Sequence, residues 1–488
     1  MLIAAWLIIG WWVSPTPPTD FVDTNVDAID LTNVPVYQVS SNKLSASVQG
    51  LRIHDVKLSD FAASAKDLNG ARVSLLGAVG DYAEVGYIAT GVAAPGVDVK
   101  WRGTPDKMTW RDASGVQFTR SIFIEDYVII VTDEIKNNSK VSATFAPYAR
   151  IVRGAADKSS AGVKTGAVSF INSDVEYRDW RKLENKSYAY STINGFTGFA
   201  DQYWETIASI SRPDQTIRVK GAGDKFVADA AAGAVTIAPG AKDTIITNIY
   251  TGPRSQDALS AAAQHIAGID ETMDYGWFWF LARPMLWLIN MFNSFVHNYG
   301  IAIILMTVLL RLILWPVTRK SYTSMMAMQK MQPEMARIQK LYANDKPRMQ
   351  MEMMRLYQTH KTSPMSGCLP MLIQIPIFFA LYKALLVSVQ MRSAHFLWIS
   401  DLAAMDPYFI LPILMGATMW LQQYLQSASS NKNAGNDPVA QTQKAMKWMP
   451  VLFTVMFAWM PAGLVLYWTV SNILAIAQMY IIKMRTAK

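Results

Sequence analysis

Arg311 is the residue whose place in this sequence most needs a chemical explanation. It lies inside the apolar run 300–315, where a fixed positive charge is unfavourable. An arginine at the centre of a membrane-spanning helix costs roughly 2.5 to 3.5 kcal/mol on insertion scales, so something must solvate it or use it. No Asp or Glu occurs in the other long apolar segments, which lie at about 368–389, 408–426, 446–460 and 463–482. The sequence therefore predicts water around Arg311, or a ligand that carries its own negative charge.

Residue patterns that carry covalent or metal chemistry are missing from the sequence. His54 and His265 are too far apart to imply a pair, and the single Cys368 allows no intramolecular disulfide and has no metal-type spacing. The sequence has no phosphate-binding Gly-Lys loop, no His-Glu-x-x-His motif and no Ser/Lys arrangement within the apolar segments. We therefore expect no enzymatic activity, no cofactor and no metal site.

The charge is distributed unevenly along the chain, and this limits the classes of partner. Residues 271–488 carry 19 Lys and Arg against 8 Asp and Glu, whereas residues 1–270 carry 26 against 29. Basic loops between apolar segments follow from the positive-inside rule, whereas a nucleic-acid-binding protein needs a basic patch on its soluble part. Because the first part is slightly acidic, we expect no nucleic-acid sequence recognition.

Residues 1–13 form an apolar run that would span only about 20 Å as a helix, against a hydrocarbon core of about 30 Å. No basic residue precedes Lys43, and no small-x-small cleavage site follows closely. We interpret the run as an uncleaved membrane anchor, with a cleaved signal peptide or a buried helix as alternatives. Residues 14–39 are Pro-rich and acidic at first and are expected to form a linker.

Residues 40–255 contain short β-branched runs, such as 127–132 and 244–250, separated by clusters of Gly, Asn, Asp and Pro. Short strands at regular spacing predict a large antiparallel β-sandwich. Because no active-site motif occurs there, we interpret this domain as a scaffold or docking module. The Ala-rich residues 256–274 follow it and are expected to form a connecting helix.

The loop charges orient the apolar part of the chain. Residues 319–361 hold nine Lys or Arg against three acidic residues, whereas residues 390–407 hold only Arg392 against Asp401 and Asp406. The first loop is therefore expected on the cytosolic side and the second outside. Trp-rich residues 275–292 are expected to lie along the outer membrane surface, with the start of the next span as the alternative.

This alternation predicts a multi-pass α-helical membrane protein with an anchor helix, five further spans and a large external β-sandwich in a periplasm-like space. The expected spans are 296–318, 368–389, 408–426, 446–460 and 463–482, and the expected cytosolic segments are 319–361, 427–445 and the tail 483–488.

Residues 319–361 are expected to form a Met-rich helical hairpin that is broken at 344–347, where Pro347 disfavours a continuous helix. The methionines suit either a promiscuous binding surface or the seam of the hairpin itself. The surrounding Lys and Arg suit anionic lipids or ribosomal RNA. In the next span, Gln374 lies between Pro370 and Pro376, and it could line a wet cavity or hydrogen-bond a neighbouring helix.

Motifs across residues 275–488 closely resemble the YidC/Alb/Oxa family of membrane protein insertases, and the long external domain resembles the Gram-negative branch. The uncharged, short N-terminal run departs from the family pattern. The motifs that carry the resemblance are 307–311, Pro316, Thr318, Tyr322, Thr323, Gln332, Pro333, 367–378, 406–408, 411–416, 461–467, Ser471 and Asn472.

The resemblance implies a five-helix core around a hydrophilic groove open to the cytosol and to lipid. It also implies that the membrane is the bacterial inner membrane, with the β-sandwich in the periplasm. It places Arg311 and Thr307 in that groove, and Gln374 is expected beside them. It also implies a hydrophobic slide formed by Ile375, Phe378, Met456 and Trp468. Nascent membrane proteins are the implied substrates, and the ribosome, the Sec translocon and anionic lipids are the expected partners.

On a continuous helix, the spacing between Arg311 and Arg319 would place Arg311 about 12 Å below the cytosolic surface. At that depth it would attract acidic segments of a substrate. A secondary transporter or channel that uses Arg311 as an anion site is the alternative, although intramembrane carboxylates and an inverted repeat are missing.

Overall fold

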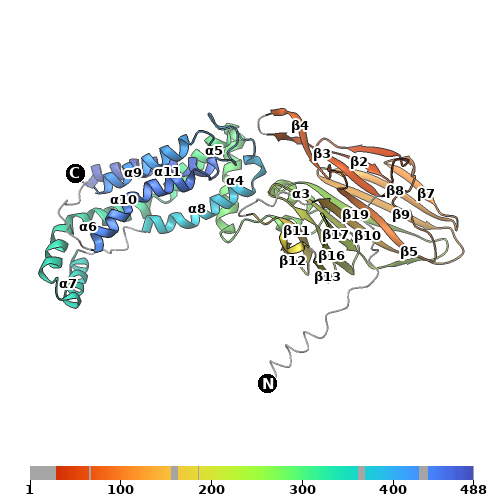
Figure 1. The fold of residues 1–488 in the computed structure, drawn as a ribbon, viewed down its shortest axis with the longest axis horizontal. Helices are drawn as coiled ribbons and strands as arrows, with labels where there is room; N and C mark the ends of the chain where they lie inside the picture. The colour runs from red at the N-terminus through yellow and green to blue at the C-terminus, as the bar shows by residue number, and fades with distance from the viewer. Residues whose placement is uncertain are drawn as a thin grey trace, which may run out of the picture. The chain divides into compact units, whose positions relative to one another are not determined.

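A computed structural model describes residues 29–64, 67–154, 163–184, 186–360, 369–427 and 438–486 of the chain (Figure 1). The expected anchor at 1–13, Cys368 and parts of the expected segments 14–39, 319–361, 427–445 and 483–488 lie outside these residues. The chain divides into two compact units, Met1–Asp274 and Tyr275–Lys488. Strands form the first unit and helices form the second (Figure 1).

The first unit is a sandwich of two antiparallel sheets, as predicted. In the described residues one sheet follows the order β1-β2-β3-β5-β10-β17-β16-β13, with β4 beside β3 and β18 beside β10. Its strands are β1 (Val36–Ser40), β2 (Leu44–Gln49), β3 (Arg52–Ser64), β4 (Asp67–Leu75), β5 (Tyr82–Thr90), β10 (Ala143–Gly154), β13 (Ser187–Thr192), β16 (Gln215–Ala222), β17 (Lys225–Ala231) and β18 (Val235–Ile237).

The second sheet follows the order β12-β11-β14-β15-β19-β9-β8-β7-β6. Its strands are β6 (Arg102–Thr104), β7 (Lys107–Arg111), β8 (Val116–Glu125), β9 (Val128–Asn137), β11 (Gly166–Ile171), β12 (Asp174–Arg178), β14 (Phe196–Ala200), β15 (Trp204–Ile210) and β19 (Lys242–Pro253). A one-turn helix, α2 (Trp180–Leu183), connects β12 to β13.

The core lies between the sheets because strands such as β8 alternate buried and partly exposed residues. Phe118 of β8 contacts Phe145 of β10, with ring centroids 5.3 Å apart. A buried ion pair between Arg120 and Asp133 lies in the same layer, and the hydroxyl of Tyr87 on β5 donates to Asp133 over 2.7 Å. Apolar packing and a fully paired charge therefore join the two sheets.

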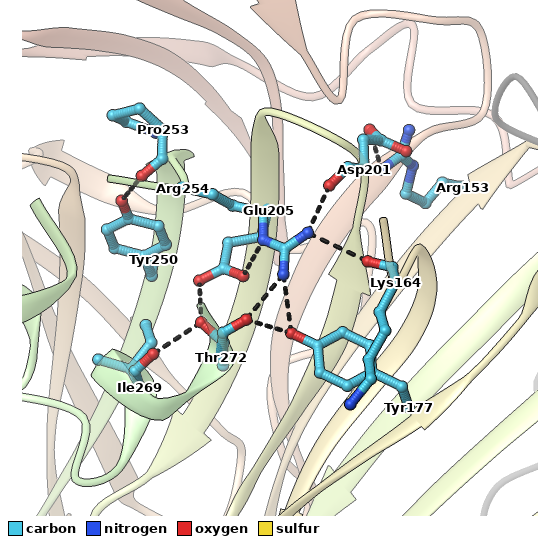
Figure 2. A network of polar contacts seen from close by, with 10 residues as sticks. All are labelled: Arg153, Lys164, Tyr177, Asp201, Glu205, Tyr250, Pro253, Arg254, Ile269 and Thr272. Atoms are coloured by element: carbon cyan, nitrogen blue, oxygen red, sulfur yellow. Dashed lines mark hydrogen bonds and ion pairs between the residues drawn. The ribbon is translucent and has the colours of Figure 1, made fainter. Parts of the chain in front are cut away.

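Arg254, whose side chain is 1% exposed, connects the segment after β19 to the sandwich through hydrogen bonds (Figure 2). One guanidinium nitrogen donates to the carbonyls of Lys164 and Asp201, and another donates to the carbonyl of Thr272 over 2.7 Å. Glu205 lies 3.4 Å from Arg254 and accepts a hydrogen bond from the Thr272 hydroxyl. These contacts fix where the chain leaves the first unit.

The prediction of one connecting helix over 256–274 is wrong in the length of the helix. The structure has only the short helix α3 (Gln256–Ala262) and the 3-10 turn η1 (Ile269–Thr272). Gly268 between them adopts a φ of 81°, and the ring of Phe170 lies where a Cβ would be. The helix has already ended at Ala262, and the left-handed Gly268 together with the burial of Ile266 and Ile269 folds the rest of the segment onto the sandwich.

The second unit contains the helices α4 (Trp279–Val296), α5 (Tyr299–Ile313), α6 (Trp315–Leu341), α7 (Lys346–Thr359), α8 (Leu369–Val387), α9 (Ile410–Ser427), α10 (Pro438–Phe457) and α11 (Ala462–Thr486), and the 3-10 turn η3 (Val389–Met391). α10 begins inside the loop expected at 427–445. α4 buries Met285 and Ile289 and exposes Trp279 and Trp287, so it is amphipathic.

The continuous span expected at 296–318 is wrong. α5 ends at Ile313, and α6 begins at Trp315 after a bend of 64° and continues to Leu341. Pro316 occupies the first turn of α6, where its missing N–H is tolerated, so a new helix begins instead of the old one continuing. The depth of about 12 Å expected for Arg311 assumed a straight helix and therefore does not apply.

By length and composition, one described segment, Ala462–Met484, could cross a membrane by itself. The bent pair Tyr299–Ile313 and Trp315–Met328 passes the same test when it is taken together, and Leu372–Val387 and Trp448–Phe457 are shorter apolar helices. The second unit is therefore apolar and helical.

We predict that the stability of the first unit falls as pH rises from about 4.5 to about 7. Burial raises the pKa of Glu205 from its ordinary 4.5 to about 7, against the opposing effects of Arg254 and Thr272. Over this range the folded state keeps a proton that the unfolded state has lost, so raising the pH favours unfolding. Hydrogen exchange of β15 and β19 in the detergent-solubilised protein, corrected for intrinsic rates, measures this slope.

Glu205→Gln removes the titration with little change in volume and should flatten this pH dependence. Glu134→Gln is the matched control, because Glu134 is an exposed carboxylate on the same sheet that pairs with Lys242. The assignment to Glu205 is wrong if Glu205→Gln keeps the wild-type slope.

Candidate functional site

Arg311 lies in the last turn of α5, and its guanidinium reaches across to α11. Its Nε and Nη2 groups donate to the hydroxyl of Ser471 over 3.0 and 2.5 Å. Tyr322 and Tyr467 are the ionisable side chains that act on it, and no carboxylate pairs with it in the described part of the chain. A partly buried arginine is thus held by neutral groups alone.

α11 presents a polar stripe of Tyr467, Ser471 and Gln478, of which Tyr467 and Ser471 are 2% exposed and Gln478 is 5% exposed. The hydroxyls of Tyr467 and Ser471 are hydrogen-bonded to each other, and Gln374 Nε2 of α8 donates to Tyr467 over 2.7 Å. Gln478 Nε2 donates to the main-chain carbonyl of Arg311 over 3.3 Å. These bonds connect α5, α8 and α11.

Thr307 lies one turn before Arg311 on α5 but is fully buried. Its hydroxyl donates to the carbonyl of Ile303 in its own helix over 2.6 Å. The neighbouring Met306 and Ala302 are buried as well. The structure therefore places Thr307 on the packed face of α5, and Gln374 makes the interhelical bond that was one of its two expected roles.

Two of the four residues expected in a hydrophobic slide meet directly. The rings of Phe378 and Trp468 are 5.4 Å apart, and both contact Phe457 of α10, at 5.7 and 5.1 Å. Ile375 and Met456 remain on the surface, each 43% exposed. The slide residues thus divide into an aromatic cluster that joins three helices and exposed aliphatic side chains beside it.

Sequence reasoning assigned no role to Phe453, Phe457, Ser471 or Tyr467. Phe453 and Phe457 stack on each other with ring centroids 5.8 Å apart, and Phe453 also contacts Trp468. Their spacing of four residues, which places two aromatics on one helical face, was the available signal. Tyr467 and Ser471 are also four residues apart, but this spacing does not indicate that Ser471 contacts Arg311 on α5.

The loop before α9 is hydrogen-bonded within itself and to the start of α11. Asp406, which is 1% exposed, accepts hydrogen bonds from the indole of Trp398 and from the main-chain N–H groups of Tyr408 and Leu411. The N–H groups of Ala462 and Gly463 donate to carbonyls of the same loop. The start of α11, and hence its polar stripe, is therefore fixed by this loop.

No group of three or more His, Cys, Asp or Glu that could hold a metal ion occurs among the described residues. The arrangement around Arg311 can bind an anion through the guanidinium and can hydrogen-bond polar groups. The chain is thus a two-part protein: a β-sandwich followed by a helical unit in which the partly buried Arg311 has no carboxylate partner among the described residues.

The sequence matches known protein families over both units of the chain. Residues 37–288 match the YidC periplasmic domain, and residues 291–488 match the 60Kd inner membrane protein family. The membrane protein insertase YidC of Aeromonas salmonicida is 38% identical, over 77% of this chain and 69% of its own length. The YidC insertase of Magnetococcus marinus is 35% identical over 90% of this chain and 81% of its own.

The chain belongs to the YidC family of membrane protein insertases. Among solved structures, a galactose mutarotase related enzyme from Lactobacillus acidophilus is similar over 44% of this chain and 97% of its own, with 8% identity and a TM-score of 0.34. That likeness carries no functional argument.

We predict that Gly416→Ala destabilises the helical unit by about 1 to 3 kcal/mol, the usual cost of overpacking. A Cβ at position 416 of α9 would overlap the hydroxyl oxygen of Thr454 on α10, which donates to the carbonyl of Pro450. The thermal aggregation temperature of the detergent-solubilised protein measures the loss.

Adding Thr454→Ala should restore much of this stability, because it removes the atom that the new methyl group meets. Thr418→Ala, which also changes a threonine near this position on α9, is the control second substitution. Equal rescue by both second substitutions would contradict the close contact between Gly416 and Thr454.

Proposed function

We propose that this chain inserts nascent membrane proteins through a hydrophilic groove open to the cytosol and to lipid, with Arg311 as its positive wall. The observation that carries the proposal is the guanidinium held by Ser471 without a carboxylate partner in the described residues. A buried cation normally needs a negative charge, and a substrate can supply it. Gln374 belongs to the wall through its bond to Tyr467.

The groove lowers the cost of moving polar segments across the membrane. An unpaired charge or main-chain group in hydrocarbon costs several kcal/mol, so a polar path through part of the bilayer shortens the unfavourable crossing. Acidic segments of the substrate pass Arg311. The apolar helix of the substrate moves from the groove into the lipid along Ile375, Met456 and the cluster of Phe378 and Trp468. This mechanism uses no covalent step and no nucleotide.

We further propose the membrane arrangement. The bent pair of α5 and α6, together with α8, α9, α10 and α11, forms the five-helix core in a bacterial inner membrane. The β-sandwich lies in the periplasm, and the hairpin of α6 and α7 and the C-terminus lie in the cytosol. The exposed basic residues of the hairpin, such as Arg337, Lys340 and Arg348, suit the ribosome and anionic lipids, and the Sec translocon is a further partner.

We predict that Arg311→Ala lowers the insertion of a single-span client with an acidic translocated tail by about tenfold or more. A hydrogen bond to a charged group contributes about 1.5 to 3 kcal/mol, and about 1.4 kcal/mol corresponds to a factor of ten. Arg311→Lys should be mild, and Arg311→Glu should be worst. Proteoliposomes with purified protein measure the protease-protected fraction of the client.

A matched client with a neutral tail should be much less sensitive to all three substitutions. Arg319→Ala is the control variant, because Arg319 is an exposed arginine at the start of α6. If Arg311→Glu inserts the acidic client as well as the wild type does, the proposed groove is wrong.

We also predict that photo-crosslinkers at Ile375 and Met456 capture the apolar segment of a ribosome-bound client, because both side chains are 43% exposed beside the aromatic cluster. Ile413 of α9, which is 61% exposed and apolar, is the control position. Capture from position 413 but not from 375 or 456 would place the lateral exit elsewhere.

A further inference from the structure

The guanidinium of Arg311 is oriented by a hydroxyl on another helix. α5 ends two residues later at Ile313, where the chain bends into α6. Ser471 of α11 accepts from both Nε and Nη2, at 3.0 and 2.5 Å. Two donors on one acceptor direct the Nε and Nη2 edge of the guanidinium at the hydroxyl of Ser471.

Ser471 is itself held in place by hydrogen bonds. A serine hydroxyl has one donor and two acceptor sites, so it can accept from Arg311 and still donate to Tyr467. Tyr467 is 2% exposed, is hydrogen-bonded to Ser471 and accepts from Gln374 of α8 over 2.7 Å. The orientation of the guanidinium therefore depends on three helices rather than on α5 alone.

α11 also contacts the main chain of Arg311. Gln478 donates to the Arg311 carbonyl over 3.3 Å, and the fully buried Ala475 lies between Ser471 and Gln478 on the same face of α11. A small residue at this position lets α5 approach closely. The polar stripe of α11 therefore binds both the side chain of Arg311, through Ser471, and its main-chain carbonyl, through Gln478.

We propose that Ser471 is a positioning residue that presents the free edge of the Arg311 guanidinium to carboxylates of the substrate. This inference rests on the proposed role of Arg311. An arginine has five N–H donors in a planar fork, and Ser471 uses the Nε and Nη2 side of that fork. The Nη1 and Nη2 edge then faces a carboxylate end-on, in the bidentate geometry that arginine favours.

The test compares Ser471→Ala with Ser471→Thr in the full chain, reconstituted in proteoliposomes. Ser471→Ala should lower the insertion of a client with an Asp- or Glu-rich translocated tail by about three- to tenfold, and leave the matched neutral-tail client within about twofold. Ser471→Thr, which keeps a hydroxyl, should recover most of the insertion of the acidic client. Equal losses for both clients would mean that Ser471 acts only in packing and would overturn the proposal.

Thr469→Ala is the matched control on the same helix. Thr469 is 5% exposed, and its hydroxyl donates to the carbonyl of Val465 in α11 itself over 2.8 Å. It should leave the ratio between the two clients unchanged. If it reduces acidic-client insertion as selectively as Ser471→Ala does, the effect is not specific to the hydroxyl that binds Arg311, and the proposal fails.

A double-mutant cycle separates this inference from the proposed function. In an Arg311→Ala background, Ser471→Ala should have no further effect on the acidic client, because the group that it positions is gone. A full additional loss would overturn the positioning role. If Arg311→Ala impairs the acidic client and Ser471→Ala does not, only the inference fails. If Arg311→Ala affects neither client, the proposed function fails and the inference fails with it.

Discussion

The hydrogen bonds from the Arg311 guanidinium to Ser471 are the contact on which the helical unit depends. Placing a fixed charge in an apolar helix is expensive, and neutral hydroxyl and amide groups lower that cost without cancelling the charge. Because α5 is short and α6 leaves it at 64°, the arginine cannot follow its own helix to a polar surface. α11 must therefore carry the groups that solvate it, and the loop around Asp406 must hold α11 in register.

Much of the fold follows from local patterns in the sequence. The run 127–132 contributes to β9, and the run 244–250 lies in β19, because alternating and β-branched residues favour a pleated surface with one buried face. Two of the departures from the predicted elements lie near a Gly or a Pro residue. The Ala-rich helix α3 ends at Ala262, and Gly268 makes a left-handed turn over Phe170 before η1. Pro316 lies in the first turn of a new helix where hydropathy alone gave one continuous span.

The candidate site was less predictable than the fold because its contacts join residues far apart in the sequence. The lack of an acidic residue near Arg311 was readable from composition. The partner of Arg311 could not be predicted, because serine is a common residue type on an apolar helix. The role of Ser471 depends on how α11 packs against α5. Gln374 had two plausible environments, and the structure shows the bond to a neighbouring helix, in which its Nε2 donates to Tyr467. The family resemblance implied a groove position for Thr307, whereas the structure buries its side chain completely.

The two units treat buried arginines in opposite ways, and the difference bears on function. In the sandwich, Arg120 is paired with Asp133, and Arg254 has Glu205 at 3.4 Å together with three main-chain carbonyls. Removing one partner from such a buried pair usually costs about 3 to 5 kcal/mol, because it leaves the other charge uncompensated. These arginines are thus occupied by groups of the sandwich itself. In the helical unit, the Arg311 guanidinium donates to one hydroxyl, that of Ser471, and no carboxylate among the described residues compensates its charge. Among the described residues, Arg120 and Arg254 of the sandwich lie against carboxylates, whereas Arg311 lies against neutral groups only. Under the proposed function, the positive charge of Arg311 is therefore available to an acidic segment of a substrate.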